Sequence, residues 1–177
     1  HLEKGAEATK EDFSLEDLTF PEKWIVTCLR NSMEKATQCA EDFRYCDFAH
    51  TIYEFIWGRF CDWYLELVKP RLSDPAQAPA ARRVLAFVLD QALRMLHPVT
   101  PFITEELWKH LAACLPSREL TGPFSNRDQG PLITASWPDI EAIPRFSGVE
   151  EEMELLQETI SGMREVRSRF HGSPYNM

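Results

Sequence analysis

A long apolar and aromatic stripe between Asp47 and Pro70 constrains the fold of this chain more than any other feature. Its bulky members recur at intervals of three and four residues, which is the period of an α-helix. They are Phe48, Ile52, Phe55, Ile56, Phe60, Trp63 and Leu67, widened by Tyr53, Trp57 and Tyr64. So broad a stripe predicts a helix that is covered on more than one side, with Trp57 and Trp63 in the core. We expect Asp47 to cap its start and Pro70 to end it, with close helix packing at Gly58.

Further segments with helical periodicity predict an all-α bundle of four or five helices. Pro21 opens one helix, and another ends at His97, because Pro98 disfavours helical geometry there. We expect the His97 N–H to hold a carbonyl that Pro98 leaves unpaired. Thr100 and Pro101 begin the next helix as N-cap and first residue, with Trp108 in the core.

The predicted organisation has a long Pro- and Gly-rich connection before the last helix. The expected parts are a flexible acidic lead-in (1–20), a four-helix core (21–114), an irregular connection (115–148), the last helix of the bundle (149–171) and a tail (172–177). Within the connection only Leu132–Ala135 resembles an extended segment. In the last helix five apolar residues are expected to face inward: Met153, Leu156, Ile160, Met163 and Phe170.

The composition narrows the class of protein. Among 177 residues, 28 acidic side chains outweigh 19 basic ones, so a protein that simply coats nucleic acid is not expected. No apolar run is long enough for a membrane-spanning helix, and the polar, acidic N-terminus does not resemble a secretory signal. Five cysteines without a C-x-x-C pair suit a reducing cytosol and predict neither disulfides nor a metal site.

Catalytic motifs are absent from the sequence. It has no glycine-rich phosphate loop, no G-x-S-x-G serine and no H-E-x-x-H metal motif. Cys46 and His50, four residues apart, are the nearest approach to a thiol–imidazole pair, and a small thiol enzyme is the remotest hypothesis. Residue chemistry alone favours a binding or scaffolding bundle with no catalytic residue.

Two segments of the sequence resemble segments of a known enzyme family. The segment Tyr53–Glu66 (YEFIWGRFCDWYLE) strongly resembles a helix of valyl-tRNA synthetases, and His97–Trp108 (HPVTPFITEELW) is similar to a turn that these class I enzymes share with their leucyl and isoleucyl relatives. Glu22–Ile25 (EKWI) resembles the opening of the family's anticodon-binding helix, and Trp137-Pro138 fits the pair that follows the bundle. The resemblance covers roughly residues 20–170.

The resemblance implies an excised anticodon-binding domain of a longer enzyme that ligates valine to its tRNA. The implied partners are the anticodon arm of a valine tRNA and the catalytic domain of the same parent chain, without DNA or membrane. ATP with magnesium is implied for the parent enzyme only, because the family's ATP-binding signatures are missing here. The implied location is the cytoplasm.

Recognition of unpaired bases needs an exposed ring with a few cations nearby. One set at the start of the first helix meets that description: Lys23, Trp24, Thr27, Arg30 and Asn31. We predict that Trp24 stacks on a base, the alternative being that it is a core residue. Arg164 and Arg167 are predicted phosphate contacts, the alternative being ion pairs with Glu165 or other acids. A helical docking module for another protein, with no RNA role, is the competing function.

Overall fold

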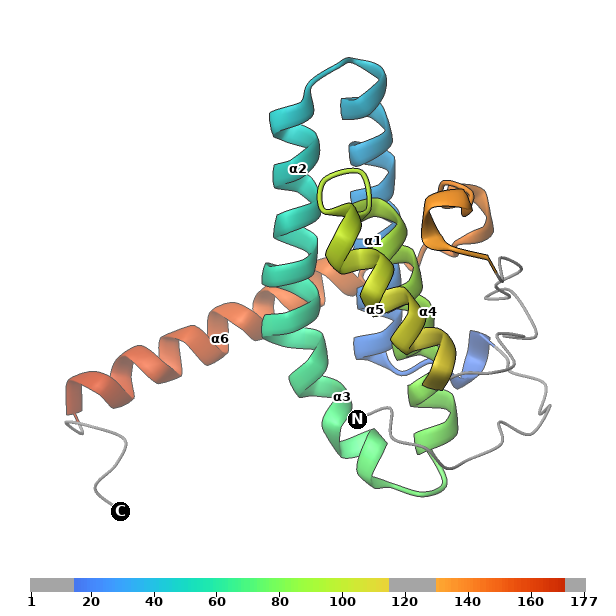
Figure 1. Ribbon diagram of the computed structural model, residues 1–177. Helices are drawn as coiled ribbons and strands as arrows, with labels where there is room; N and C mark the ends of the chain where they lie inside the picture. Colours follow the sequence, from blue (N-terminus) through green and yellow to red (C-terminus); the bar gives the residue numbers. More distant parts are fainter. Residues whose placement is uncertain (1–14, 115–129, 171–177) are drawn as a thin grey trace.

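The computed structural model describes residues 15–114 and 130–170, and within these ranges the chain is helical without a strand (Figure 1). Its helices are α1 (Phe20–Glu41), α2 (Tyr45–Tyr53), η2 (Glu54–Tyr64), α3 (Leu65–Ser73), α4 (Ala78–Leu96), α5 (Pro101–Cys114) and α6 (Val149–Phe170). Short 3-10 turns are η1 (Leu15–Asp17), η3 (Leu132–Thr134) and η4 (Ile140–Ala142). The predicted all-α class is confirmed. The expected tail at 172–177 lies outside the described residues, as does the first half of the connection.

The start of α1 is fixed by a buried carboxylate. Glu22 accepts the backbone N–H and the hydroxyl of Thr19, each at 2.9 Å, which satisfies groups that a helix N-terminus leaves free. Arg71 of α3 donates to the same carboxylate. Leu18, 3% exposed, packs into the core just before this cap. The flexible lead-in predicted for 1–20 is therefore wrong for residues 15–20, and residues 1–14 lie outside the described ranges.

α2, η2 and α3 form one continuous helix from Tyr45 to Ser73, and its middle section, η2, has π-helical hydrogen bonding. Two predicted boundaries are wrong. The helix begins two residues before Asp47, whose carboxylate accepts from Arg44 at 3.0 Å. Pro70 lies inside α3, where it is exposed, so water can satisfy the carbonyl that its missing N–H leaves free.

The main core lies between α1, the long helix and α4, with Trp24, Tyr64 and Phe55 among its largest fully buried side chains. Trp108, 2% exposed, belongs to a smaller cluster beneath α5, so its predicted core position is confirmed. Trp57 is 57% exposed, and the prediction that it is core is wrong.

Gly58 also departs from its predicted role. A Cβ at this position would meet nothing within 4 Å, so no helix packs closely there. Gly58 lies in the π-helical section, whose wider turn changes which side chains face the core.

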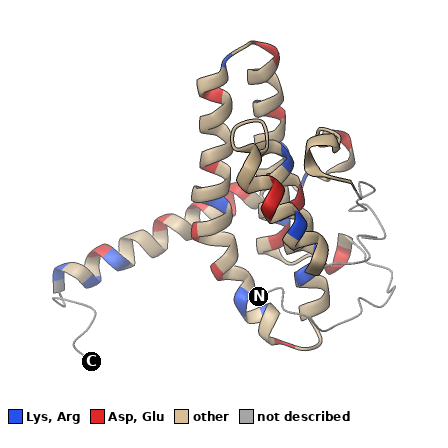
Figure 2. Ribbon diagram, in the orientation of Figure 1, with Lys and Arg blue, Asp and Glu red and all other residues tan. Residues whose placement is uncertain are grey.

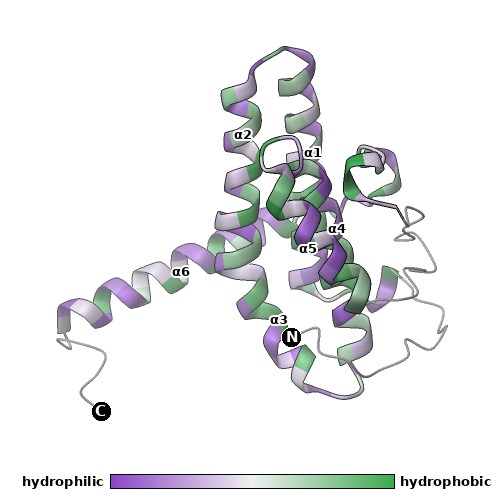
Figure 3. Ribbon diagram, viewed as in Figure 1, coloured by the Kyte–Doolittle hydropathy of each residue, from purple (hydrophilic) through white to green (hydrophobic). Residues whose placement is uncertain are grey.

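α6 starts against α1 and then leaves the bundle (Figure 1). Met153 is fully buried, whereas Leu156 and Met163 are 37% and 67% exposed. The predicted inward stripe is therefore wrong for Leu156 and Met163, whereas Ile160 is half-buried. The side chain of Phe170 lies outside the described residues. Periodicity reports that a helix has an apolar face, but it does not report whether another element covers that face. Figure 3 shows this mixture of apolar and polar residues along the projecting part.

Two local predictions in the connections are also wrong. Leu132–Thr134 is a 3-10 turn, not extended, and Glu105 accepts the N–H groups of Leu132 and Ile133 at 3.2 Å each. The ring of His97 meets the Thr104 hydroxyl, with Nδ1 and Oγ1 2.8 Å apart, instead of a carbonyl freed by Pro98.

Candidate nucleic-acid interface

Trp24 is 1% exposed, so its predicted stacking on a base is wrong. The physical reason is the surroundings of α1, which contacts the long helix, α4 and α6. A ring at this position has no face open to solvent. The core alternative for Trp24 is the correct one.

Lys23 and Thr27 lie where α1 meets the connection to α6. The buried Thr27 hydroxyl donates to the carbonyl of Lys23 at 2.9 Å and accepts the N–H of Phe146 at 3.2 Å. The Lys23 ammonium lies 5.9 Å from the centroid of the Phe146 ring. Thr27 therefore holds the connection in place, and an RNA contact by the half-buried Lys23 stays a prediction.

Arg30 and Asn31 also form hydrogen bonds with the connection that leads to α6. Arg30 Nη1 donates to the carbonyls of Ile140 and Ile143, at 2.7 and 2.5 Å. Asn31 donates to Glu150 of α6 at 2.9 Å and accepts from Arg145 at 2.7 Å. Both side chains are thus engaged in holding residues 140–150 against α1.

Arg164 and Arg167 are exposed on the projecting half of α6. Figure 2 shows basic residues at this outer end and acidic residues nearer the bundle. Glu165 pairs with Arg169 at 2.5 Å. At about 1.5 Å per helical residue, Arg164 lies roughly 20 Å along α6 from Glu150, the residue that Asn31 contacts. The predicted α1 and α6 residues therefore do not form one site, and the phosphate contacts stay a prediction.

The structure exposes a different group of aromatic side chains along the long helix and the turn before it. This ring surface consists of Phe43, Tyr45, Tyr53 and Trp57, which are 76%, 64%, 59% and 57% exposed. The rings of Tyr53 and Trp57 are stacked, with centroids 6.4 Å apart and planes 7° from parallel. Those of Phe43 and Tyr45 meet edge to face at 6.3 Å.

Phe43 has a backbone conformation that favours glycine. Its φ is 57°, in the left-handed region, and the Arg44 N–H closes the end of α1 by donating to the Cys39 carbonyl at 2.8 Å. A side chain here costs on the order of 1 kcal/mol. A strained aromatic residue that is also the most exposed ring of the surface points to a function for that ring.

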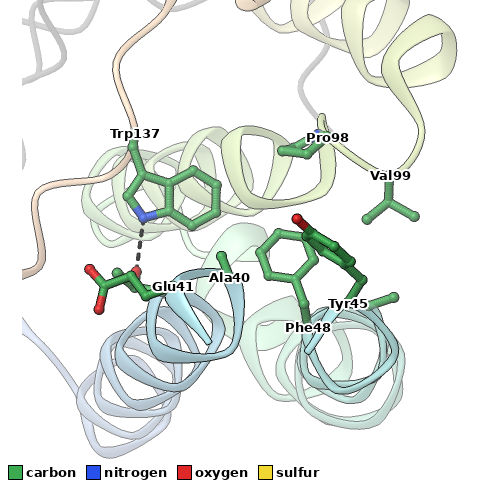
Figure 4. Close-up of a pocket in the computed structure, with 9 residues that line it drawn as sticks. Ala40, Glu41, Tyr45, Phe48, Pro98, Val99 and Trp137 are labelled. Carbon is green, nitrogen blue, oxygen red and sulfur yellow. Dashed lines mark hydrogen bonds between the residues drawn. The ribbon is translucent and has the colours of Figure 1, made fainter. Parts of the chain in front are cut away.

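Next to the ring surface lies an open, mainly apolar pocket of about 670 Å³ (Figure 4). It is formed by α1, α2, the turn between α4 and α5, and Trp137. Its lining residues are Thr37, Ala40, Glu41, Tyr45, Phe48, Ala49, Pro98, Val99 and Trp137. The Trp137 indole donates to the Thr37 hydroxyl at 2.9 Å, and its ring lies 6.1 Å from that of Phe48. In the sequence, only the Trp137-Pro138 pair points to this pocket. Its other walls could not be predicted, because Thr37, the partner of Trp137, lies 100 positions away.

The thiol-enzyme hypothesis gains no support from the geometry. Cys46 and His50 are both exposed, and no hydrogen bond joins them in the part of the chain described. His50 Nε2 lies 3.9 Å from the carboxylate of Glu54 instead. Burial raises the pKa of the Cys28 thiol to about 12, so this cysteine is not a nucleophile. No group of three metal-ligating side chains occurs among the described residues.

The described residues form a helical bundle with exposed aromatic rings beside an apolar pocket. Residues 22–174 match the family described as the anticodon-binding domain of tRNA ligase, and the chain belongs to that family. No described helix is long and apolar enough to cross a membrane.

Similar proteins narrow the class further. The chain is 34% identical over 165 residues to the valine–tRNA ligase of Staphylococcus saprophyticus, a match that covers 89% of this chain and 17% of the relative. The corresponding enzyme of Rhodopirellula baltica is 33% identical over 96% of this chain and 16% of its own length. That of Bacillus licheniformis is 39% identical over 83% and 15%. The chain thus spans less than a fifth of these relatives.

Proposed function

We propose that this chain recognises the anticodon arm of a valine tRNA as part of a valine–tRNA ligase. The observation that carries the proposal is the ring surface, Phe43, Tyr45, Tyr53 and Trp57, on a bundle of the anticodon-binding family. Anticodon bases are unpaired, so they can leave the loop and stack on protein rings. Each stacked base contributes about 1–3 kcal/mol to binding.

The charge of the chain sets the character of this binding. Because 28 acidic side chains outweigh 19 basic ones, giving a net charge of −9, we expect few phosphate contacts and an affinity that comes mainly from stacking. We expect weak binding that weakens further with salt. Arg164 and Arg167 remain the proposed phosphate contacts on α6.

In this proposal the catalytic steps belong to other parts of the parent enzyme. Valine activation with ATP and magnesium takes place outside these residues, and the location is cytoplasmic, in keeping with the free cysteines. The catalytic domain is a proposed intramolecular partner. The exposed apolar side chains of α6, including Leu155 and Met163, favour a packing role for that helix against another part of the parent.

A binding comparison with two hairpins tests the function. The chain is titrated against a labelled stem–loop with a valine anticodon and against one in which only the anticodon is changed. Tighter binding of the first is expected, whereas equal affinities would overturn the proposal. Tyr45→Ala should weaken binding of the first hairpin. Leu155→Ala removes a similarly exposed apolar side chain from α6 and serves as the matched control.

A further inference from the structure

We infer that Asn31 is a positioning residue: its side-chain amide spans the turn at Gly148 and sets the direction in which α6 leaves the bundle. That direction does not depend on the proposed function. The task of the basic outer end of α6, which carries Arg164 and Arg167, is the part that rests on the proposed function.

α6 is attached to the bundle by its first turns (Figure 1). Val149 is 8% exposed and Met153 is fully buried. Between residues 154 and 169 the side chains are exposed, apart from the half-buried Gln157 and Ile160. About 25 Å of helix lies beyond Met153, so a tilt of about 20° at the attachment would move the outer end by roughly 9 Å. Whatever fixes the first turns therefore fixes the place of the basic end.

The turn before α6 has a conformation that favours glycine. Gly148 has a φ of 79°, in the left-handed region that strains other residues. Its carbonyl accepts the Glu152 N–H at 3.2 Å, which begins the helix. A Cβ at Gly148 would meet nothing within 4 Å, so nothing packs closely against the turn on that side. The contacts that fix the angle must come from the chain before and after the turn.

Asn31 of α1 holds the chain on both sides of Gly148. Its carbonyl oxygen accepts from Arg145 at 2.7 Å, and its amino group donates to the Glu150 carboxylate at 2.9 Å. A side-chain amide both donates and accepts, so it can join a cation to an anion in this way. The bond to Glu150 and the burial of Met153 give the start of α6 two attachments, which together restrict its tilt.

The segment before the turn is also held without Asn31. Arg145 donates to Glu34 at 2.8 Å as well, and the backbone bonds to α1 described above do not involve Asn31. Glu150, by contrast, forms its one hydrogen bond within the described ranges with Asn31. Loss of the Asn31 donor should therefore release α6 while residues 140–146 stay in place.

Asn31→Asp separates the two bonds. A carboxylate still accepts from Arg145, but it cannot donate to Glu150 and repels it. The added change Glu150→Gln restores a bond of reversed polarity, because the glutamine amide donates to the new carboxylate. The matched control is Gln38→Glu, which places an acid beside Asp42 on α1, where the native amide donates at 3.1 Å.

Double electron–electron resonance measures the direction of α6 in the chain without RNA. One nitroxide is attached to the exposed Cys46 of α2 and the other to Ser168→Cys near the end of α6, after Cys61 and Cys114 are changed to serine. The otherwise unaltered chain should give one narrow distance distribution. Asn31→Asp should broaden it by up to about 9 Å, the displacement that a tilt of about 20° produces.

The added change Glu150→Gln should return Asn31→Asp to the narrow distribution, and Gln38→Glu should keep it. A narrow distribution in Asn31→Asp would overturn the inference, because the packing of Met153 would then be sufficient to direct α6. Failure of Glu150→Gln to restore it, or an equal broadening in Gln38→Glu, would also overturn it. Hydrogen exchange in residues 140–146 should stay slow in Asn31→Asp. Faster exchange there would mean that Asn31 holds the connection instead of directing α6.

A binding comparison connects the direction of α6 to RNA. Arg164→Ala should weaken binding of the valine anticodon hairpin in the unaltered chain and have a smaller effect in Asn31→Asp, because the two changes are coupled through the position of α6. An equal loss in both backgrounds would overturn the positioning role. If Arg164→Ala has no effect in the unaltered chain, the proposed phosphate contact is wrong, and the distances measured without RNA decide whether Asn31 directs α6.

Discussion

Arg71 and Glu22, 49 positions apart, join the end of the long helix to the first turn of α1 through an ion pair whose carboxylate is buried. The same carboxylate caps α1, so one group supports both a helix start and a tertiary contact. Tyr64 lies close enough for the charge of Glu22 to help raise its pKa, after burial, which is the larger cause.

Removal of Arg71 should leave that carboxylate buried without its cation. We expect Arg71→Met to lower the free energy of unfolding by about 3 kcal/mol, measured by urea denaturation. The added change Glu22→Gln should recover part of the loss, because a neutral amide needs no counter-charge. Lys69→Met is the matched control on the same helix. Its exposed pair with Glu66 is worth less than about 1 kcal/mol, so an equal loss would contradict the interpretation.

Trp24 and Trp57 both lie on apolar stripes of the sequence, but they should contribute very differently to the free energy of unfolding. Trp24→Ala should cost about 3–5 kcal/mol of stability, because it opens a cavity in the core. Trp57→Ala should cost at most about 1.5 kcal/mol, the value of its stacking on Tyr53, because more than half of its side chain is already exposed. Thermal unfolding of both variants checks this. Similar melting temperatures for the two would mean that the assignment of core and surface is incorrect.

The sequence predicted the helices well because their signals are local. The Thr100-Pro101 start and the period of α1 and α4 involve neighbours a few residues apart. Trp24 and Trp57 both lie on broad apolar stripes, and what covers a stripe depends on distant elements and, for Trp57, on the π-helical section.

The binding surface was harder to predict for the same reason. Arg30 looked free in the sequence, yet its partners Ile140 and Ile143 lie more than 100 positions away. The pocket likewise needs Trp137 to meet Thr37 across the whole bundle. Such contacts leave no periodic trace in a single sequence.

Arg30 should be essential for the order of the connection. Arg30→Ala leaves the carbonyls of Ile140 and Ile143 without their donor, and we expect a loss of about 1–3 kcal/mol. Hydrogen exchange should become faster in residues 140–146, while α4 keeps its protection. Lys35→Ala, at an exposed site on the same helix, should change neither. Unaltered exchange in Arg30→Ala would show that other contacts suffice.

Stability should fall at alkaline pH through Cys28. Burial raises the pKa of its thiol from 9.0 to about 12, so above pH 9 the unfolded chain releases a proton that the folded chain keeps. The contribution is complete below pH 9 and is lost as the pH rises towards 12, by about 1.4 kcal/mol per pH unit. The slope is measured by urea unfolding between about pH 8 and about pH 10, roughly one unit either side of the ordinary pKa of a thiol. Cys28→Ala should flatten it, and an unchanged slope would assign the effect to other groups.

Phe43 offers a test of whether strain is retained for function. Phe43→Gly and Phe43→Ala both remove the exposed ring, but only glycine relieves the left-handed backbone. We expect the glycine variant to be more stable than the alanine variant by about 1 kcal/mol in urea unfolding. Both should bind the valine anticodon hairpin more weakly than the unaltered chain, because both lack the ring. If both bind as well as the unaltered chain, Phe43 is not an RNA contact, and the strain at this turn has a structural origin.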